Sequence, residues 1–198
     1  MTYGQMKDFV LQLLNRYSIA GEKTPLCYND QADIVARIPA LAADALQYMA
    51  TSCRRLREVA KLASPEKLGQ FLLYQLPDDC YQICGGLLWR TEDGDVKRYH
   101  DYQLVGGRQV LIPAWDKGEF LVEYFRYPSV FRGKPDDDDF LDCPPEAQTA
   151  IAYYVAAHLA MEDNNYLHGA LYNEFEMKML RLQEGPTAQC GKVEDVYG

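Results

Sequence analysis

The residues best suited to catalysis lie in one short stretch toward the C-terminal end. His158 and Glu162 are four residues apart, which places them on one face of a helix, and Asp163 and His168 follow. Imidazole and carboxylate groups are ligands of zinc and related metals. However, no second histidine stands at ligand spacing on that helix, and His158 lies in an apolar stripe, which favours a hydrogen-bonded core residue. A small metal-dependent enzyme using His158, Glu162 and Asp163 is therefore an alternative, and we predict no catalytic, cofactor-binding or metal-binding residues.

The second chemically notable stretch is acidic and reads KPDDDDFLDCPPEAQ, residues 134–148. A calcium loop spaces its oxygen ligands at alternating positions and contains a glycine, whereas these four aspartates are consecutive. We predict that Asp136 to Asp139 form a solvated connection without a tightly bound cation. We predict that Asp142 caps the helix that follows, so that Asp142→Ala costs about 1 kcal/mol while replacement of the run by Asn changes little.

The basic residues are concentrated at Arg54, Arg55, Arg57 and Lys61, which fall on a predicted helix. Binding to nucleic acid depends on basic side chains that neutralise phosphates. The net charge of −9 argues against a protein that coats nucleic acid. We interpret the cluster as a solvated helix face, and a regulatory DNA-binding module that uses the three arginines is a further alternative.

Composition and motifs further limit the possible domain organisation, function and location of the protein. The 198 residues are 48% hydrophobic, suit one medium domain and contain neither a nucleophile motif nor a phosphate-binding glycine loop. The N-terminal stretch lacks the apolar core of a signal peptide, and no stretch is apolar enough to span a membrane. We expect a soluble protein made in the cytoplasm, without cofactors. We also expect free, mostly buried thiols at Cys27, Cys53, Cys80, Cys84, Cys143 and Cys190.

Hydrophobic periodicity predicts helices at both ends of the chain. Apolar residues three and four apart predict a helix over residues 3–17 and a longer one that continues through Leu56 and Ala60, with Pro39 either opening its main part or kinking it. After Pro144 and Pro145, two further stripes predict two helices separated by the sequence EDNN.

Between these helices, the apolar period changes from 3.6 to 2. Aromatic and β-branched segments separated by EDGD, GG and DKG predict about four antiparallel strands over residues 80–127. In the last of them, Phe120, Val122 and Tyr124 point to one face of the sheet. We therefore predict an α+β, mainly α fold.

The predicted domain, residues 1–185, is a helical bundle (residues 1–79 and 128–185) with an inserted β module of about four strands. Residues 186–198 form a flexible tail. Its apolar residues Val193, Val196 and Tyr197 are candidate anchors that order on a partner. Fifteen tyrosines exceed what a core needs and indicate contact surfaces, because each hydroxyl group must stay wet or find a partner.

The succession of several strings resembles the head-to-tail adaptor (connector) proteins of tailed bacteriophages and prophages, including tail accessory and head-completion subunits. The strings are ADIVARIPALAADALQYMA, YQLPDDCYQICGG, VEYFRYPSVF, PPEAQTAIAYYVAAHLAMED, LYNEFEMKMLRLQEG and a final VEDVYG. They cover nearly the whole chain in order, and none of them is a catalytic signature.

This resemblance implies a non-enzymatic virion subunit at the head–tail junction. Members of the group form a ring, commonly dodecameric, beneath the portal protein and create a platform for the tail proteins. DNA passes through the channel without specific binding, which an acidic wall would favour by repelling phosphates. The resemblance also implies a helical body with a β insertion and a C-terminal segment that reaches the portal or a neighbouring subunit.

Overall fold

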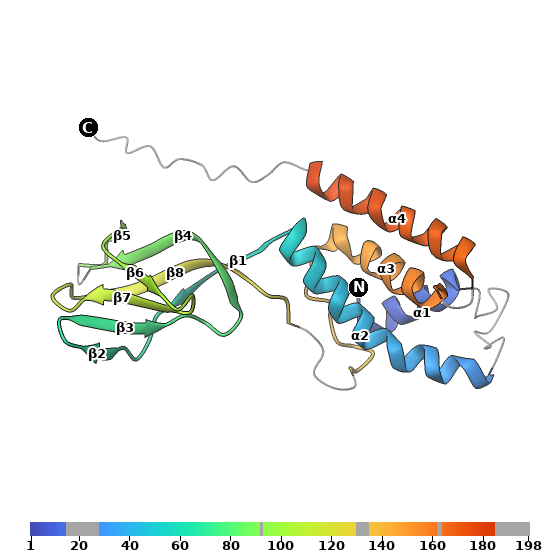
Figure 1. Ribbon diagram of the computed structural model, residues 1–198, viewed down its shortest axis with the longest axis horizontal. Helices are drawn as coiled ribbons and strands as arrows, with labels where there is room; N and C mark the ends of the chain where they lie inside the picture. The colour runs from blue at the N-terminus through green and yellow to red at the C-terminus, as the bar shows by residue number, and fades with distance from the viewer. Residues whose placement is uncertain (15–27, 92, 130–134, 162–163, 185–198) are drawn as a thin grey trace. The chain divides into compact units, whose positions relative to one another are not determined.

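A computed structural model describes residues 1–14, 28–91, 93–129, 135–161 and 164–184 (Figure 1). The chain divides into a helical unit, made of Met1–Arg54 and Ser129–Gly198, and a β unit, Arg55–Pro128. In the described residues the fold is α+β, with four α-helices and two antiparallel four-stranded sheets. Strand accounts for 30% and helix for 42%, so the fold is not clearly mainly α as the sequence predicted.

The helical unit is built around one buried helix. α3 packs against each of the other three helices, and eight of its thirteen residues are buried. Five of these eight are alanine, which is small enough to let neighbouring helices approach on several sides. In the described part of the chain, no helix has both the length and the apolarity needed to cross a membrane. The helices of the unit are α1 (Tyr3–Leu13), α2 (Tyr28–Ser52), the short 3₁₀ helix η1 (Pro145–Ala147), α3 (Gln148–Ala160) and α4 (Asn165–Glu184).

The β unit consists of two sheets that share one core. The first sheet has the strand order β1-β8-β4-β5 and the second has the order β2-β3-β7-β6, with all neighbours antiparallel. The rings of Tyr74 and Phe120 meet between the sheets, with centroids 5.9 Å apart. The strands are β1 (Leu56–Lys61), β2 (Glu66–Leu68), β3 (Phe71–Gln75), β4 (Cys80–Arg90), β5 (Val96–Tyr99), β6 (Gln103–Val105), β7 (Gln109–Pro113) and β8 (Glu119–Arg126).

The alternation predicted for the last strand is confirmed. Phe120, Val122 and Tyr124 of β8 are at most 2% exposed and belong to the core, while their neighbours along the strand are only partly buried. One face of β8 therefore packs on the second sheet.

The prediction of a helix through Leu56 and Ala60 is wrong. α2 ends at Ser52, and β1, β2 and β3 follow within residues 56–75, so strands begin well before residue 80. Leu56 and Ala60 are four residues apart and mimic a helical stripe, while the strands of this segment are only three to six residues long. Such short strands give too few alternations to reveal a period of two.

The strands of residues 80–127 differ from the prediction in one detail, and one of the two alternatives left open for Pro39 is excluded. Residues 96–105 form two strands of different sheets, β5 and β6, instead of one, and the region 80–127 holds five strands. α2 runs through Pro39 and does not open there. α3 ends at Ala160 and α4 begins at Asn165, so the two predicted helices are separate.

Candidate functional site

The acidic run, Asp136 to Asp139, is hydrogen-bonded through its backbone to the first turn of α1. Asp136 to Asp139 are exposed, as predicted, but their backbone is tied to the N-terminus of the chain. The N–H group of Tyr3 donates to the carbonyl oxygen of Asp139 (2.7 Å), and that of Gly4 donates to the carbonyl oxygen of Asp137 (2.9 Å). These bonds satisfy amide groups in the first turn of a helix, which have no partner inside the helix.

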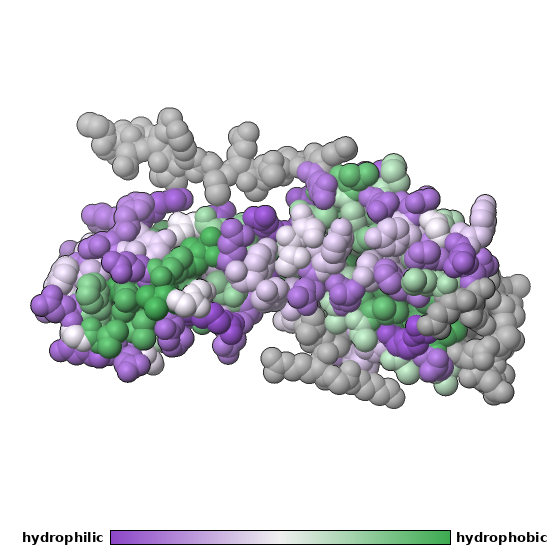
Figure 2. Space-filling model, in the orientation of Figure 1, coloured by the Kyte–Doolittle hydropathy of each residue, from purple (hydrophilic) through white to green (hydrophobic). Residues whose placement is uncertain are grey.

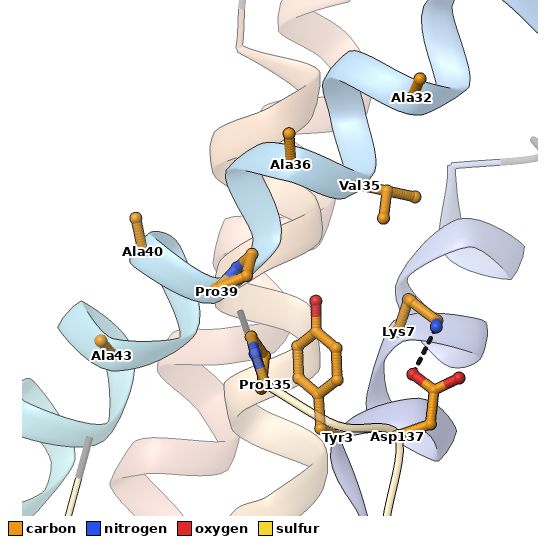
Figure 3. A pocket seen from close by; sticks show the side chains of 10 residues that line it. All are labelled: Tyr3, Lys7, Ala32, Val35, Ala36, Pro39, Ala40, Ala43, Pro135 and Asp137. Carbon is orange, nitrogen blue, oxygen red and sulfur yellow. Dashed lines mark hydrogen bonds and ion pairs between the residues drawn. The ribbon is translucent and has the colours of Figure 1, made fainter. Parts of the chain in front are cut away.

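A groove lies between this junction and α2 (Figure 3). Lys7 of α1 forms an ion pair with Asp137 (2.5 Å) at one side, and the Tyr3 hydroxyl group is directed toward α2. The wall on α2 carries short side chains, so the hollow has a volume of about 720 Å³. Its lining consists of Tyr3, Lys7, Ala32, Val35, Ala36, Pro39, Ala40, Ala43, Pro135 and Asp137.

We expect Gly4→Ala to weaken the helical unit more than Asp137→Asn does. A Cβ atom at position 4 would lie 2.9 Å from the Asp137 Cβ atom and 3.0 Å from its carbonyl oxygen, so the junction must shift, at a cost of about 1–2 kcal/mol. The Asp137 side chain is 64% exposed, and loss of its ion pair should cost less than about 1 kcal/mol.

Urea unfolding followed by far-UV circular dichroism measures both effects. Gly169→Ala on α4 is the matched control, because its Cβ atom would meet nothing within 4 Å and alanine is the better helix former. An Asp137→Asn cost larger than the Gly4→Ala cost would show that the side-chain pair, and not the backbone junction, holds the acidic run.

The prediction that Asp142 is the helix cap is wrong. The 3₁₀ turn η1 begins at Pro145 with Pro144 as its N-cap residue, and that position makes no side-chain capping bond. The Asp142 carboxylate accepts a hydrogen bond from the backbone N–H group of Ser129 (2.6 Å). Proline has no N–H group, so Pro144 and Pro145 offer a capping carboxylate no donor.

His158 of the alternative metal site, on α3, lies near His168 on α4. The ring centroids of His158 and His168 are 6.3 Å apart. Nδ1 of His158 donates to the carbonyl oxygen of Tyr154 and Nδ1 of His168 to that of Ala157, each at 2.9 Å. Glu162 and Asp163 lie outside the described residues, and among the described residues no three His, Cys, Asp or Glu side chains are grouped to hold a metal ion.

The histidines are part of an aromatic cluster that connects three helices. The rings of Tyr154 and His158 are tilted by 31° with centroids 4.0 Å apart, and Phe175 of α4 meets the rings of Tyr48 (6.0 Å) and Tyr154 (5.1 Å). The Tyr154 hydroxyl group donates to the carboxylate of Asp44 on α2. Burial raises the pKa of Tyr154, and the hydrogen bond to Asp44 raises it further.

We expect the stability of the helical unit to fall as the pH rises above about 10. A raised pKa means that the folded chain holds the phenolic proton of Tyr154 more tightly than the unfolded chain does. Protonated Tyr154 therefore stabilises the fold fully below the unfolded pKa of about 10, and this contribution is lost as the pH rises above that value. Tyr154→Phe should unfold more easily at neutral pH, by about 1 kcal/mol, and lose part of this pH dependence.

Urea unfolding between about pH 8 and pH 11 tests this. Tyr166→Phe is the control, since Tyr166 is 88% exposed. Equal slopes of stability against pH in the Tyr154→Phe variant and the unmodified chain would contradict the role of Tyr154.

The basic cluster is not on a helix, contrary to the prediction. Arg57 and Lys61 lie on β1 and pair with the carboxylates of Glu123 and Glu119. Arg54 pairs with Glu146 (3.4 Å), and the Arg55 guanidinium lies 5.1 Å from the centroid of the Phe125 ring. These basic groups therefore contact acidic and aromatic neighbours, and they do not share one helix face.

The β unit carries an apolar surface that the sequence analysis missed. The buried residues Tyr74, Val110 and Ile112 define the inner face of the second sheet, so the alternate residues lie on its outer face. Figure 2 shows hydrophobic side chains gathered in a band across this unit. On the outer face, the register brings together Leu68, Phe71, Leu73, Val105 and Leu111, with Glu66, Gln75, Gln103 and Gln109 at the margins.

The exposure of this outer face is high for aliphatic and aromatic side chains. Leu68 is 54% exposed, Val105 38% and Phe71 36%. An alternation of period two could have identified the outer face, but β2 and β6 have only three residues each. Pairing across four strands was needed to show that these residues are neighbours.

The predicted tail anchors Val193, Val196 and Tyr197 lie outside the described residues. The four cysteines in the described part of the chain, Cys53, Cys80, Cys84 and Cys143, form no disulfide bond there and are partly buried. No protein-family model matches this chain, and no curated protein is similar enough to count as a match.

Proposed function

We propose that this protein is a non-enzymatic virion subunit, a head-to-tail adaptor of a tailed phage or prophage that forms a ring between the portal and the tail. The succession of sequence strings that resembles this family supports the proposal. The chain order of helices, β unit and helices is the order that the resemblance implies.

The observation that carries the proposal is that the chain exposes two apolar surfaces, the groove beside α2 and the outer face of the second sheet. Exposed apolar patches of this kind mark interaction sites in soluble proteins. An adaptor in a ring needs several such surfaces at once, for its two neighbours, the portal and the tail proteins. Val193, Val196 and Tyr197 are proposed as a further contact, with the portal or a neighbouring subunit.

Mass measurement of the purified chain with and without a candidate portal protein tests the function. We expect a closed ring on the portal. Deleting the gene from the phage or prophage should give filled heads without tails, and the intact gene should restore tails. Truncation after Gly185 should weaken incorporation. Normally tailed particles without this protein, together with no portal binding, would refute the proposal.

A further inference from the structure

The outer face of the second sheet is a broad apolar surface whose size and charge indicate which partner would fit it. It presents large side chains, Leu68, Phe71, Leu73, Val105 and Leu111, over four strands. The strand spacing of about 4.8 Å and a rise of about 3.3 Å per residue give an area roughly 19 Å wide and 17 Å long. Its margins carry three glutamines and one glutamate, so the face bears almost no charge.

The groove of the helical unit is lined on α2 by small side chains, in contrast to the large side chains of the outer face. Its α2 wall runs from Ala32 to Ala43, which is roughly 18 Å of helix at 1.5 Å per residue. Four of the six α2 residues that line it are alanine, so large side chains can enter a hollow of about 720 Å³. Its two charged residues, Lys7 and Asp137, already neutralise each other.

We propose that the outer face of one copy docks on the α2 groove of a second copy, so that adjacent subunits are joined by a helix-on-sheet contact. The two surfaces are similar in length, large side chains on one face small side chains on the other, and neither carries more than one net charge. Packing a helix on the apolar face of a sheet is the usual way to bury such a face. Because the two surfaces are different, the contact is head-to-tail and repeats from copy to copy.

This inference rests on the proposed ring and names the contact that would close it. The matching area is roughly 300 Å² in projection, well below the roughly 800 Å² per partner of a stable pair. The free subunits should therefore associate weakly, and the contact gains strength when a ring or a portal holds many copies together.

Two variants, each with one defective surface, test the contact in solution. Leu73→Glu places a charge in the outer face and leaves the groove intact, while Ala36→Arg fills the groove and leaves the outer face intact. Unlabelled Ala36→Arg chain is added to ¹⁵N-labelled Leu73→Glu chain at about 1 mM, where weak contacts are populated. We expect the amide signals of residues 32–43 to shift as the partner is added.

Two control additions test whether the shift comes from the outer face of the added chain. Unlabelled Leu73→Glu chain should cause no shift, because both copies then lack the outer face. Lys67→Glu, introduced into the added Ala36→Arg chain, should leave the shift unchanged, because Lys67 pairs with Leu72 and lies on the opposite side of β2. Circular dichroism of each variant must first show the unfolding transition of the unmodified chain.

Three results would overturn the inference. One is no shift at about 1 mM between folded variants. Another is an equal shift with the Leu73→Glu addition. The third is a concentration-dependent shift on the outer face of the Ala36→Arg chain alone, which would show two outer faces pairing with each other. Each of these leaves the test of portal binding and tail assembly intact, so the contact and the proposed function can fail separately.

Discussion

Phe120→Ala should destabilise the β unit by about 3–5 kcal/mol, because it empties the centre of the core that the two sheets share. Phe120 is 1% exposed, and its ring meets those of Tyr74 and Tyr99, with centroids 5.9 Å and 5.0 Å away. Both tryptophans of the chain, Trp89 and Trp115, lie in this unit, so urea unfolding followed by tryptophan fluorescence measures its stability.

The helical unit provides the internal control for this variant. Far-UV circular dichroism is dominated by α1 to α4, and this signal should keep its transition while the fluorescence transition moves to lower urea. Phe140→Ala is the matched substitution, because Phe140 is 77% exposed and its cost should be small. If both signals moved together by the same amount, the two units would be unfolding as one.

Gly118→Ala should be the most damaging glycine substitution in the β unit, at a cost of about 2 kcal/mol or more. Gly118 has φ +142°, a conformation that residues with side chains rarely adopt. A Cβ atom there would also lie 2.6 Å from the carbonyl oxygen of Arg90 and 2.4 Å from Trp89 Nε1. That nitrogen donates to the carbonyl oxygen of Lys117 (3.0 Å), so the substitution also disturbs this bond.

Gly107→Ala measures the cost of a positive φ angle without the close contacts that a Cβ atom at position 118 would make. Gly107 also has a positive φ, +74°, but its Cβ atom would meet nothing within 4 Å, so only the strain of about 1 kcal/mol should remain. Tryptophan fluorescence during urea unfolding compares the two variants. Equal costs would show that the approach of Arg90 and Trp89 to Gly118 does not limit which residue fits there.

The sequence predicted correctly the apolar sides of the last helix and the last strand, whose patterns contain many repeats. Of the apolar stripe predicted for the last helix, Leu171, Phe175, Met179 and Leu182 of α4 are buried and Leu167 is partly buried. The alternating face predicted for β8 is buried. Several helical turns of α4, and several alternations of β8, place apolar residues on the same side. Short elements such as β2 and β6 do not carry such a signal, and β1 carries one with helical spacing.

The candidate surfaces could not be predicted from the hydrophobic pattern alone, because they combine residues that are distant in the sequence. The ion pair between Lys7 and Asp137 joins residues 130 positions apart, and the outer face combines residues of four strands. The sequence indicated that Asp136 to Asp139 would be exposed, because four adjacent charges are costly to bury. It did not indicate that their backbone would receive the amide groups of α1.

What the sequence determined by itself was therefore local: helices at both ends, strands between them, and which side of a long element is apolar. These follow from the period of the backbone, 3.6 or 2, which every residue of an element repeats. The tertiary structure decided where α2 stops, how the eight strands of the described residues divide into two sheets, and which apolar residues remain on the surface. Those outcomes depend on strand register and on contacts between distant segments, and a one-residue change of register moves every side chain to the other face.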